Sequence, residues 1–105
     1  MRKITIIILL LLCHHPVMLA QQNNNWYFGA KAGLSFNNVT NQPLPFALTN
    51  GAMISDESST AISDSTGKLL FYTNGVTVYN RLHQVMLNGD NLKGNESACQ
   101  GALIT

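Results

Sequence analysis

The sequence predicts an all-β fold, and three observations support this prediction. Aromatic and β-branched residues, which favour strands, occur in short runs separated by Gly, Asn and Pro. Two tight-turn sequences separate the runs at residues 60–63, 68–73 and 76–80. No segment after Ala20 shows a sustained helical period of apolar residues. Together these features predict an antiparallel meander of short strands.

The first strands are expected near residue 26. Trp26-Tyr27-Phe28 places three aromatic residues in succession, which favours a strand. Leu34-Ser35-Phe36 alternates between apolar and polar residues, as in a strand with one buried face. Residues 37–45 contain repeated Asn and two Pro and therefore predict a loop, after which residues 46–48 predict a short strand.

The strongest pattern lies between residues 60 and 80. Strands are predicted at 60–63 and 68–73, joined by a turn in which Asp64 suits the first position and Gly67 the last. Asn74-Gly75 predicts a type I′ hairpin, whose two central residues both need positive φ, before the alternating residues 76–80. These connections are too short for parallel crossovers, so we expect three antiparallel strands in a meander.

A weaker fourth strand is predicted at residues 84–87, and residues 102–105 resemble the start of another. The apolar pairs Ala61-Ile62 and Ala102-Leu103 are 41 residues apart, with about four strands per interval. This spacing is compatible with one blade of a β-propeller, which takes about 40–45 residues and four strands. A small β-sandwich remains the alternative, because its short strands give a similar pattern.

Residues 1–20 have the three-part order of a cleavable secretory signal peptide. Two basic residues follow Met1, and an apolar run of nine residues comes next, whereas a membrane-spanning helix needs about twenty. Ala20 supplies the small residue at the cleavage site, so the mature chain is expected to begin at Gln21. The sequence then predicts a polar linker at 21–25 and a β segment at 26–105.

Export is therefore expected, with the extracellular space or the outer cell surface as the destination. The periplasm is an alternative, as is a lipid anchor on Cys13, which follows the apolar run. Leu12 places a bulky side chain directly before this thiol, so Ala20 is the preferred cleavage site. Membrane contact is expected only through the signal peptide during export.

The composition of the mature chain excludes several functions. Four basic and five acidic side chains give a net charge of −1, with no basic patch, so nucleic acid is not an expected partner. Cys99 is the only cysteine after Ala20, which excludes an internal disulfide and a cysteine-rich metal site.

The sequence predicts no catalytic, metal or cofactor site. A calcium loop at Asp64 would need more acidic ligands. His83 is the only histidine after Ala20 and has no nearby cysteine, so it lacks the further ligands of a zinc site. Asp56 and Glu57 are adjacent, so on a strand they would point to opposite faces, and an exposed loop is the preferred interpretation. Cys99 is expected to be a small buried residue or a free thiol.

Four aromatic residues are candidates for a surface that stacks on a sugar or a peptide. Residues of this type at strand spacing more often pack in a core or form cross-strand pairs, which is the alternative here. The candidates are Trp26, Tyr27, Tyr72 and Tyr79.

Several segments, taken in order, resemble the N-terminal, first-blade region of WD-repeat-like β-propeller surface proteins of gliding bacteria. They are residues 25–29, 32–36, 62–64, 67–80 and 83–89. The long block from Gly67 to Asn80 is the specific one. Such proteins carry PKD-type domains and a C-terminal sorting domain read by the type IX secretion system. The resemblance implies that this chain is the opening blade of an incomplete propeller, with Cys99 where the family has a hydroxyl residue.

The predicted function is that of a non-enzymatic scaffold or binding module of an exported, cell-surface protein of the gliding-motility and type IX secretion class. Its expected partners are the downstream propeller blades and an unidentified protein or glycan ligand. The alternative is the N-terminal fragment of a secreted enzyme that acts on extracellular polymers, with its catalytic residues in downstream blades.

Processing of the chain can be tested directly. When the protein is produced in a bacterium, mass spectrometry of the exported form should find Gln21, open or cyclised, at the N-terminus, because signal peptidase cuts after Ala20. An intact Met1 in a soluble cytoplasmic pool would contradict export. A diacylglycerol adduct on Cys13 would establish the lipid-anchored alternative.

Overall fold

The computed structural model describes residues 20–99 and 101–105. The predicted signal peptide, including Cys13, lies outside these residues except for Ala20, so its cleavage stays a prediction. Ala20 is exposed, and the carbonyl of Gln21 accepts a hydrogen bond from the Asn24 N–H at 3.1 Å.

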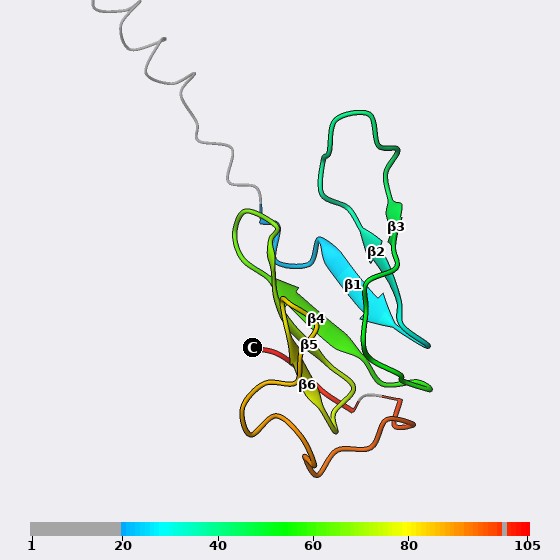
Figure 1. The fold of residues 1–105 in the computed structure, drawn as a ribbon, viewed down its shortest axis with the longest axis vertical. Helices are drawn as coiled ribbons and strands as arrows, with labels where there is room; N and C mark the ends of the chain where they lie inside the picture. Colours follow the sequence, from blue (N-terminus) through cyan, green and yellow to red (C-terminus); the bar gives the residue numbers. More distant parts are fainter. Residues whose placement is uncertain (1–19, 100) are drawn as a thin grey trace, which may run out of the picture.

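The all-β prediction is confirmed. The described residues form six strands and no helix. The strands are β1 (Asn25–Phe28), β2 (Ala32–Ser35), β3 (Phe46–Leu48), β4 (Thr60–Ser63), β5 (Leu69–Thr73) and β6 (Val78–Asn80). They make two antiparallel sheets, β1-β2-β3 and β4-β5-β6, and in Figure 1 β1 lies beside β4 at the junction of the two sheets.

The first sheet has one buried and one exposed face on β1. Asn25 and Tyr27 point inward, whereas Trp26 and Phe28 point outward, because successive strand residues alternate between faces. On β2, Gly33 leaves room for close pairing, since a Cβ there would lie 2.7 Å from the carbonyl oxygen of Trp26. The bounds of β1 and β3 confirm the strands that were expected at residues 26–28 and 46–48.

The predicted linker at residues 21–25 extends one residue too far. Asn25 begins β1 and is buried, and its side-chain amide donates to Ser63 Oγ at 2.8 Å and to the carbonyl of Gly67 at 2.7 Å. A buried amide is stable only when it is hydrogen-bonded, and these two bonds tie β1 to the end of β4 and to the following turn.

The predicted meander between residues 60 and 80 is confirmed. β4 pairs with β5 and β5 with β6, both antiparallel, and Tyr72 lies opposite Ala61 on one side and Tyr79 on the other. In the first connection, the Gly67 N–H donates to the Asp64 carbonyl at 3.0 Å, and Gly67 has a φ of 83°. This is the tight turn that the sequence predicts.

The prediction of a type I′ hairpin at Asn74-Gly75 is wrong. Of these two residues only Gly75 has a positive φ, at 87°, and β6 begins at Val78, so the connection is longer than two residues. Asn74 Oδ1 accepts hydrogen bonds from the backbone N–H groups of Val76 and Thr77, at 3.0 and 2.9 Å. Asparagine side chains compete in this way with the ladder hydrogen bonds of a hairpin, which delays the start of the next strand.

The two weaker strands are not formed as predicted. Residues 84–87 make one isolated bridge, Tyr79↔Val85, with the Met86 N–H donating to the Val78 carbonyl at 2.9 Å. This segment therefore runs beside β6 irregularly and does not form a regular strand. Residues 102–105 adopt no regular structure.

The core lies where the two sheets meet. Among the described residues, Tyr27, Met53 and Tyr72 are the buried hydrophobic ones, and Tyr79 packs against them together with aliphatic side chains. The ring of Tyr72 stacks on Tyr27, with centroids 4.5 Å apart, and on Tyr79, with centroids 5.2 Å apart. The stack therefore joins β1 of one sheet to β5 and β6 of the other.

A substitution at Gly75 tests the loop between β5 and β6. Gly75→Val should lower the free energy of unfolding by about 1 kcal/mol or more, because a β-branched residue is strained at positive φ. Its Cβ would also lie 3.1 Å from the carbonyl oxygen of Gly101. Urea denaturation followed by circular dichroism measures the loss, with Ser65→Val, at an exposed position of the 64–67 turn, as the control. Equal losses in the two variants would contradict this account.

Candidate functional site

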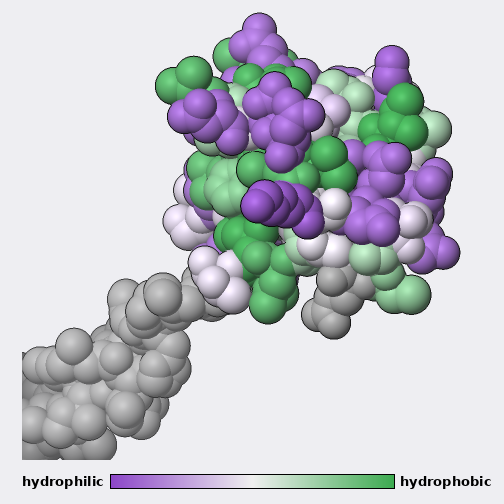
Figure 2. Space-filling view, turned by 90° about the horizontal axis from the view of Figure 1, so that it is seen from below, coloured by the Kyte–Doolittle hydropathy of each residue, from purple (hydrophilic) through white to green (hydrophobic). Residues whose placement is uncertain are grey.

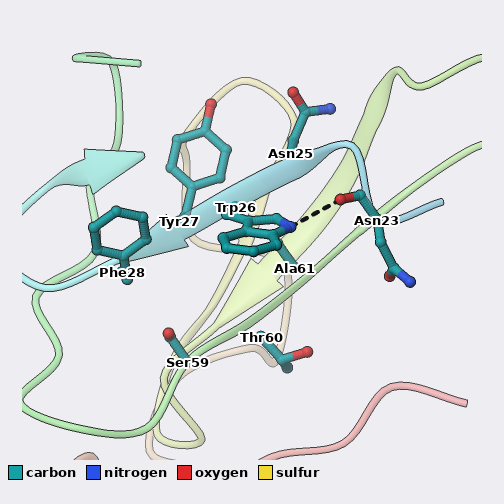
Figure 3. Close-up of a pocket in the computed structure, with 8 residues that line it drawn as sticks. All are labelled: Asn23, Asn25, Trp26, Tyr27, Phe28, Ser59, Thr60 and Ala61. Atoms are coloured by element: carbon teal, nitrogen blue, oxygen red, sulfur yellow. Dashed lines mark hydrogen bonds between the residues drawn. The ribbon is translucent and has the colours of Figure 1, made fainter. Parts of the chain in front are cut away.

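A groove of about 460 Å³ lies between β1 and β4. These strands are edges of their own sheets, and beside the groove the chain segments are joined by a hydrogen bond from the Ser63 N–H to the Gln22 carbonyl at 2.7 Å. Aromatic, amide, hydroxyl and methyl groups line the groove. The lining residues are Asn23, Asn25, Trp26, Tyr27, Phe28, Ser59, Thr60 and Ala61 (Figure 3).

Trp26 is the largest accessible side chain of this groove. It is 51% exposed, and its Nε1–H donates to the carbonyl of Asn23 at 2.9 Å. Phe36 lies against the indole with ring centroids 5.0 Å apart and planes tilted by 52°. Figure 3 shows the indole and the Tyr27 phenol on opposite sides of β1. The exposed indole is therefore held in place by a hydrogen bond and an aromatic neighbour.

The groove carries polar groups but no charge near neutral pH. Asn23 supplies a side-chain amide, and Ser59 and Thr60 supply hydroxyl groups from the β4 side. Among the lining residues there is no Asp, Glu, Lys, Arg or His. The Tyr27 phenol points into the core, where burial raises its pKa to about 12, with the nearby phenol of Tyr72 adding to the shift. A hydrogen bond from Tyr27 to Asn50 at 2.9 Å opposes this shift without cancelling it.

The structure separates the four candidate aromatics. Tyr27 and Tyr72 are only 4% and 0% exposed, so their assignment to a ligand surface is wrong: both rings are used in the core. Tyr79 is half-buried and stacks on Tyr72, which makes it a core residue as well. Only Trp26 presents its ring to solvent. The alternative interpretation, core packing and cross-strand pairing, holds for the three tyrosines.

Sequence reasoning missed two aromatic neighbours of Trp26. Phe28 lines the groove, and Phe36 supports the indole from the residue after β2. The alternation of β1 would have found Phe28, because residues two apart on a strand share a face. Phe36 required knowledge of the β1–β2 register, in which Trp26 lies opposite Leu34.

His83 has a structural position. Its Nδ1 lies 3.1 Å from the Tyr72 hydroxyl, and its ring packs near those of Tyr27 and Tyr72. The Tyr72 oxygen also accepts the Ala52 N–H at 3.0 Å, so its own O–H is available to donate to a neutral imidazole. Burial lowers the pKa of His83 below the ordinary 6.5. His83 is therefore packed against the tyrosine core.

One contact joins the thiol to an acidic side chain, since Cys99 Sγ lies 3.9 Å from Glu57 Oε2. Asp64 accepts the hydroxyl and backbone N–H of Thr66, and these bonds, together with the Lys68 N–H, lower the pKa of its carboxyl. Asp56 and Glu57 lie on an exposed loop, as expected, and Cys99 is an exposed free thiol. Among residues 20–99 and 101–105, no three His, Cys, Asp or Glu side chains are grouped to hold a metal.

Comparisons with known proteins found no matching family model, curated protein or solved structure. In the part of the chain that the structure describes, no helix has the length and apolar character needed to cross a bilayer.

The position of His83 predicts a pH-dependent stability. The free energy of unfolding should decrease as the pH falls below about 6.5, because the unfolded chain takes up a proton more readily than the folded chain. The loss should level off below the lowered pKa of the folded chain. Urea denaturation at a series of pH values measures it.

His83→Asn is the matched control for this measurement. Asparagine tolerates the φ of 63° at this position and does not titrate. The carboxyl of Asp64 titrates below its ordinary pKa of 3.8, outside this range. The variant should therefore show a flatter profile between neutral pH and pH about 5, and an unchanged slope would contradict the role given to His83.

Proposed function

We propose that this chain is a non-enzymatic scaffold and binding module of an exported, cell-surface protein. The observation that carries the proposal is the exposed, fixed indole of Trp26 beside a groove at the junction of two sheets. Binding sites are typically concave, with aromatic walls and a few polar groups, and this groove has both.

The roles of the polar residues support a function without catalysis. The imidazole of His83 is bonded to Tyr72, and the carboxylate of Asp64 accepts the hydrogen bonds of its own turn. General acid–base catalysis needs such a group within reach of a substrate, whereas these two stabilise the fold. The groove itself supplies surface and hydrogen-bonding groups.

The scaffold role rests on sheet architecture and on the resemblance to first-blade regions. β4-β5-β6 is a three-stranded antiparallel sheet with residues 84–89 beside β6. We take this sheet as the inner part of a propeller blade, which has four strands. Large hydrophobic side chains are exposed in several places, which suits packing against further β-structure. They include Phe28, Ile54, Leu70, Leu82, Val85, Leu87 and Leu103. Figure 2 shows several groups of hydrophobic residues exposed on one face, with hydrophilic residues between them.

Surface labelling of intact cells tests the proposal. A tagged chain should be accessible to an external antibody and to added protease, and Trp26→Ala should reach the surface in equal amount but be retained there less firmly during washing. The reason is that Trp26 lies outside the buried core, so its loss affects binding more than folding. A chain that stays protected inside the cell would overturn the proposal.

A further inference from the structure

We infer that the Trp26 groove binds a neutral glycan. This inference rests on the proposed binding function and adds the chemical class of the ligand. It follows from the aromatic surface, the uncharged polar groups and the spacing of the two strands that border the groove.

The indole supplies a flat apolar surface of the kind that packs on the C–H face of a sugar ring. Its orientation is fixed by the hydrogen bond to the Asn23 carbonyl and by Phe36. A side chain already ordered before binding loses less conformational entropy when a ligand arrives. Phe28, 38% exposed and on the same face of β1, extends the aromatic surface along the strand.

The polar lining matches hydroxyl groups. The Asn23 amide offers both donors and an acceptor, and the hydroxyls of Ser59 and Thr60 act as either. A sugar hydroxyl likewise donates and accepts, so each of these groups can bond it without a charge. No Asp, Glu, Lys, Arg or His side chain lines the groove, so the lining has no charge to attract an acidic polysaccharide or a phosphate.

The strand spacing argues against a peptide inserted between the sheets. Residues of β1 and β4 already approach with Cα atoms within 8 Å of each other. An inserted strand needs about 9.5 Å between its two neighbours, twice the usual spacing. The hydrogen bond between Ser63 and Gln22 further holds the two edges together. A ligand that lies on the aromatic surface needs no such separation.

The single tryptophan makes the test direct, because Trp26 is the only source of tryptophan fluorescence in the protein. The purified exported chain is titrated with neutral hexasaccharides of glucose, xylose, mannose and N-acetylglucosamine. A saturable change in emission with at least one of them is expected. The titration extends to about 10 mM sugar, a concentration at which even millimolar binding would be detected. The absence of a saturable change with all four sugars would overturn the inference.

Variants of Trp26 distinguish an effect on sugar stacking from an effect on folding. Trp26→Ala should weaken binding by at least about tenfold in isothermal titration calorimetry, whereas Trp26→Phe should retain part of it. Leu87→Ala is the matched control, since Leu87 is 94% exposed and lies outside the groove. Circular dichroism confirms that each variant is folded. Equal binding by wild type and a folded Trp26→Ala would contradict the assignment of the site.

Two further probes distinguish failure of the inference from failure of the proposed function. Tighter binding of polygalacturonate than of any neutral sugar would overturn the neutral-glycan assignment. Trp26-dependent binding of a casein peptide mixture, without sugar binding, would overturn the glycan inference and leave the binding module intact. A chain that is not surface-exposed would overturn the proposed function, whatever it binds in solution.

Discussion

The fold depends on the stacking of Tyr72 between Tyr27 and Tyr79. Each sheet is too short to bury an apolar face by itself, and the three rings supply contact area across the junction. Stacked aromatic pairs contribute about 0.5–1.5 kcal/mol each beyond the area they bury. The hydroxyl of Tyr72 adds hydrogen bonds with Ala52 and His83, so this completely buried side chain also organises two loops.

A network of amides completes the junction at the other end of β1. The Asn25 amide reaches Ser63 and Gly67 across the two sheets, and the side chain of Asn37 donates to the same Gly67 carbonyl at 2.7 Å. Satisfied buried networks of this kind specify one arrangement, because any shift would leave a buried polar group without a partner. The asparagine-rich composition therefore has a structural use beyond its preference for loops.

The position of the groove follows from the alternation of side chains along β1. Alternation along this strand sends Tyr27 into the stack and leaves Trp26 on the opposite side, facing solvent beside β4. The interaction that holds the sheets together therefore also positions the indole. A ligand on Trp26 would contact residues at the junction of the two sheets. Its binding would therefore stabilise the packing of one sheet against the other.

Local sequence patterns were enough to predict β1, from its aromatic run, together with β3, β4, β5 and the turn from Asp64 to Gly67. They could not determine the Asn74 loop, because the side-chain bonds of Asn74 to the following backbone compete with the predicted hairpin. Nor could the sequence distinguish the buried aromatic residues from the exposed one. Trp26, Tyr27, Tyr72 and Tyr79 have similar local patterns, and only the packing of two sheets decided which rings were buried. Which residues border the groove likewise depended on β1 meeting β4, a contact between segments more than thirty residues apart that no local pattern encodes.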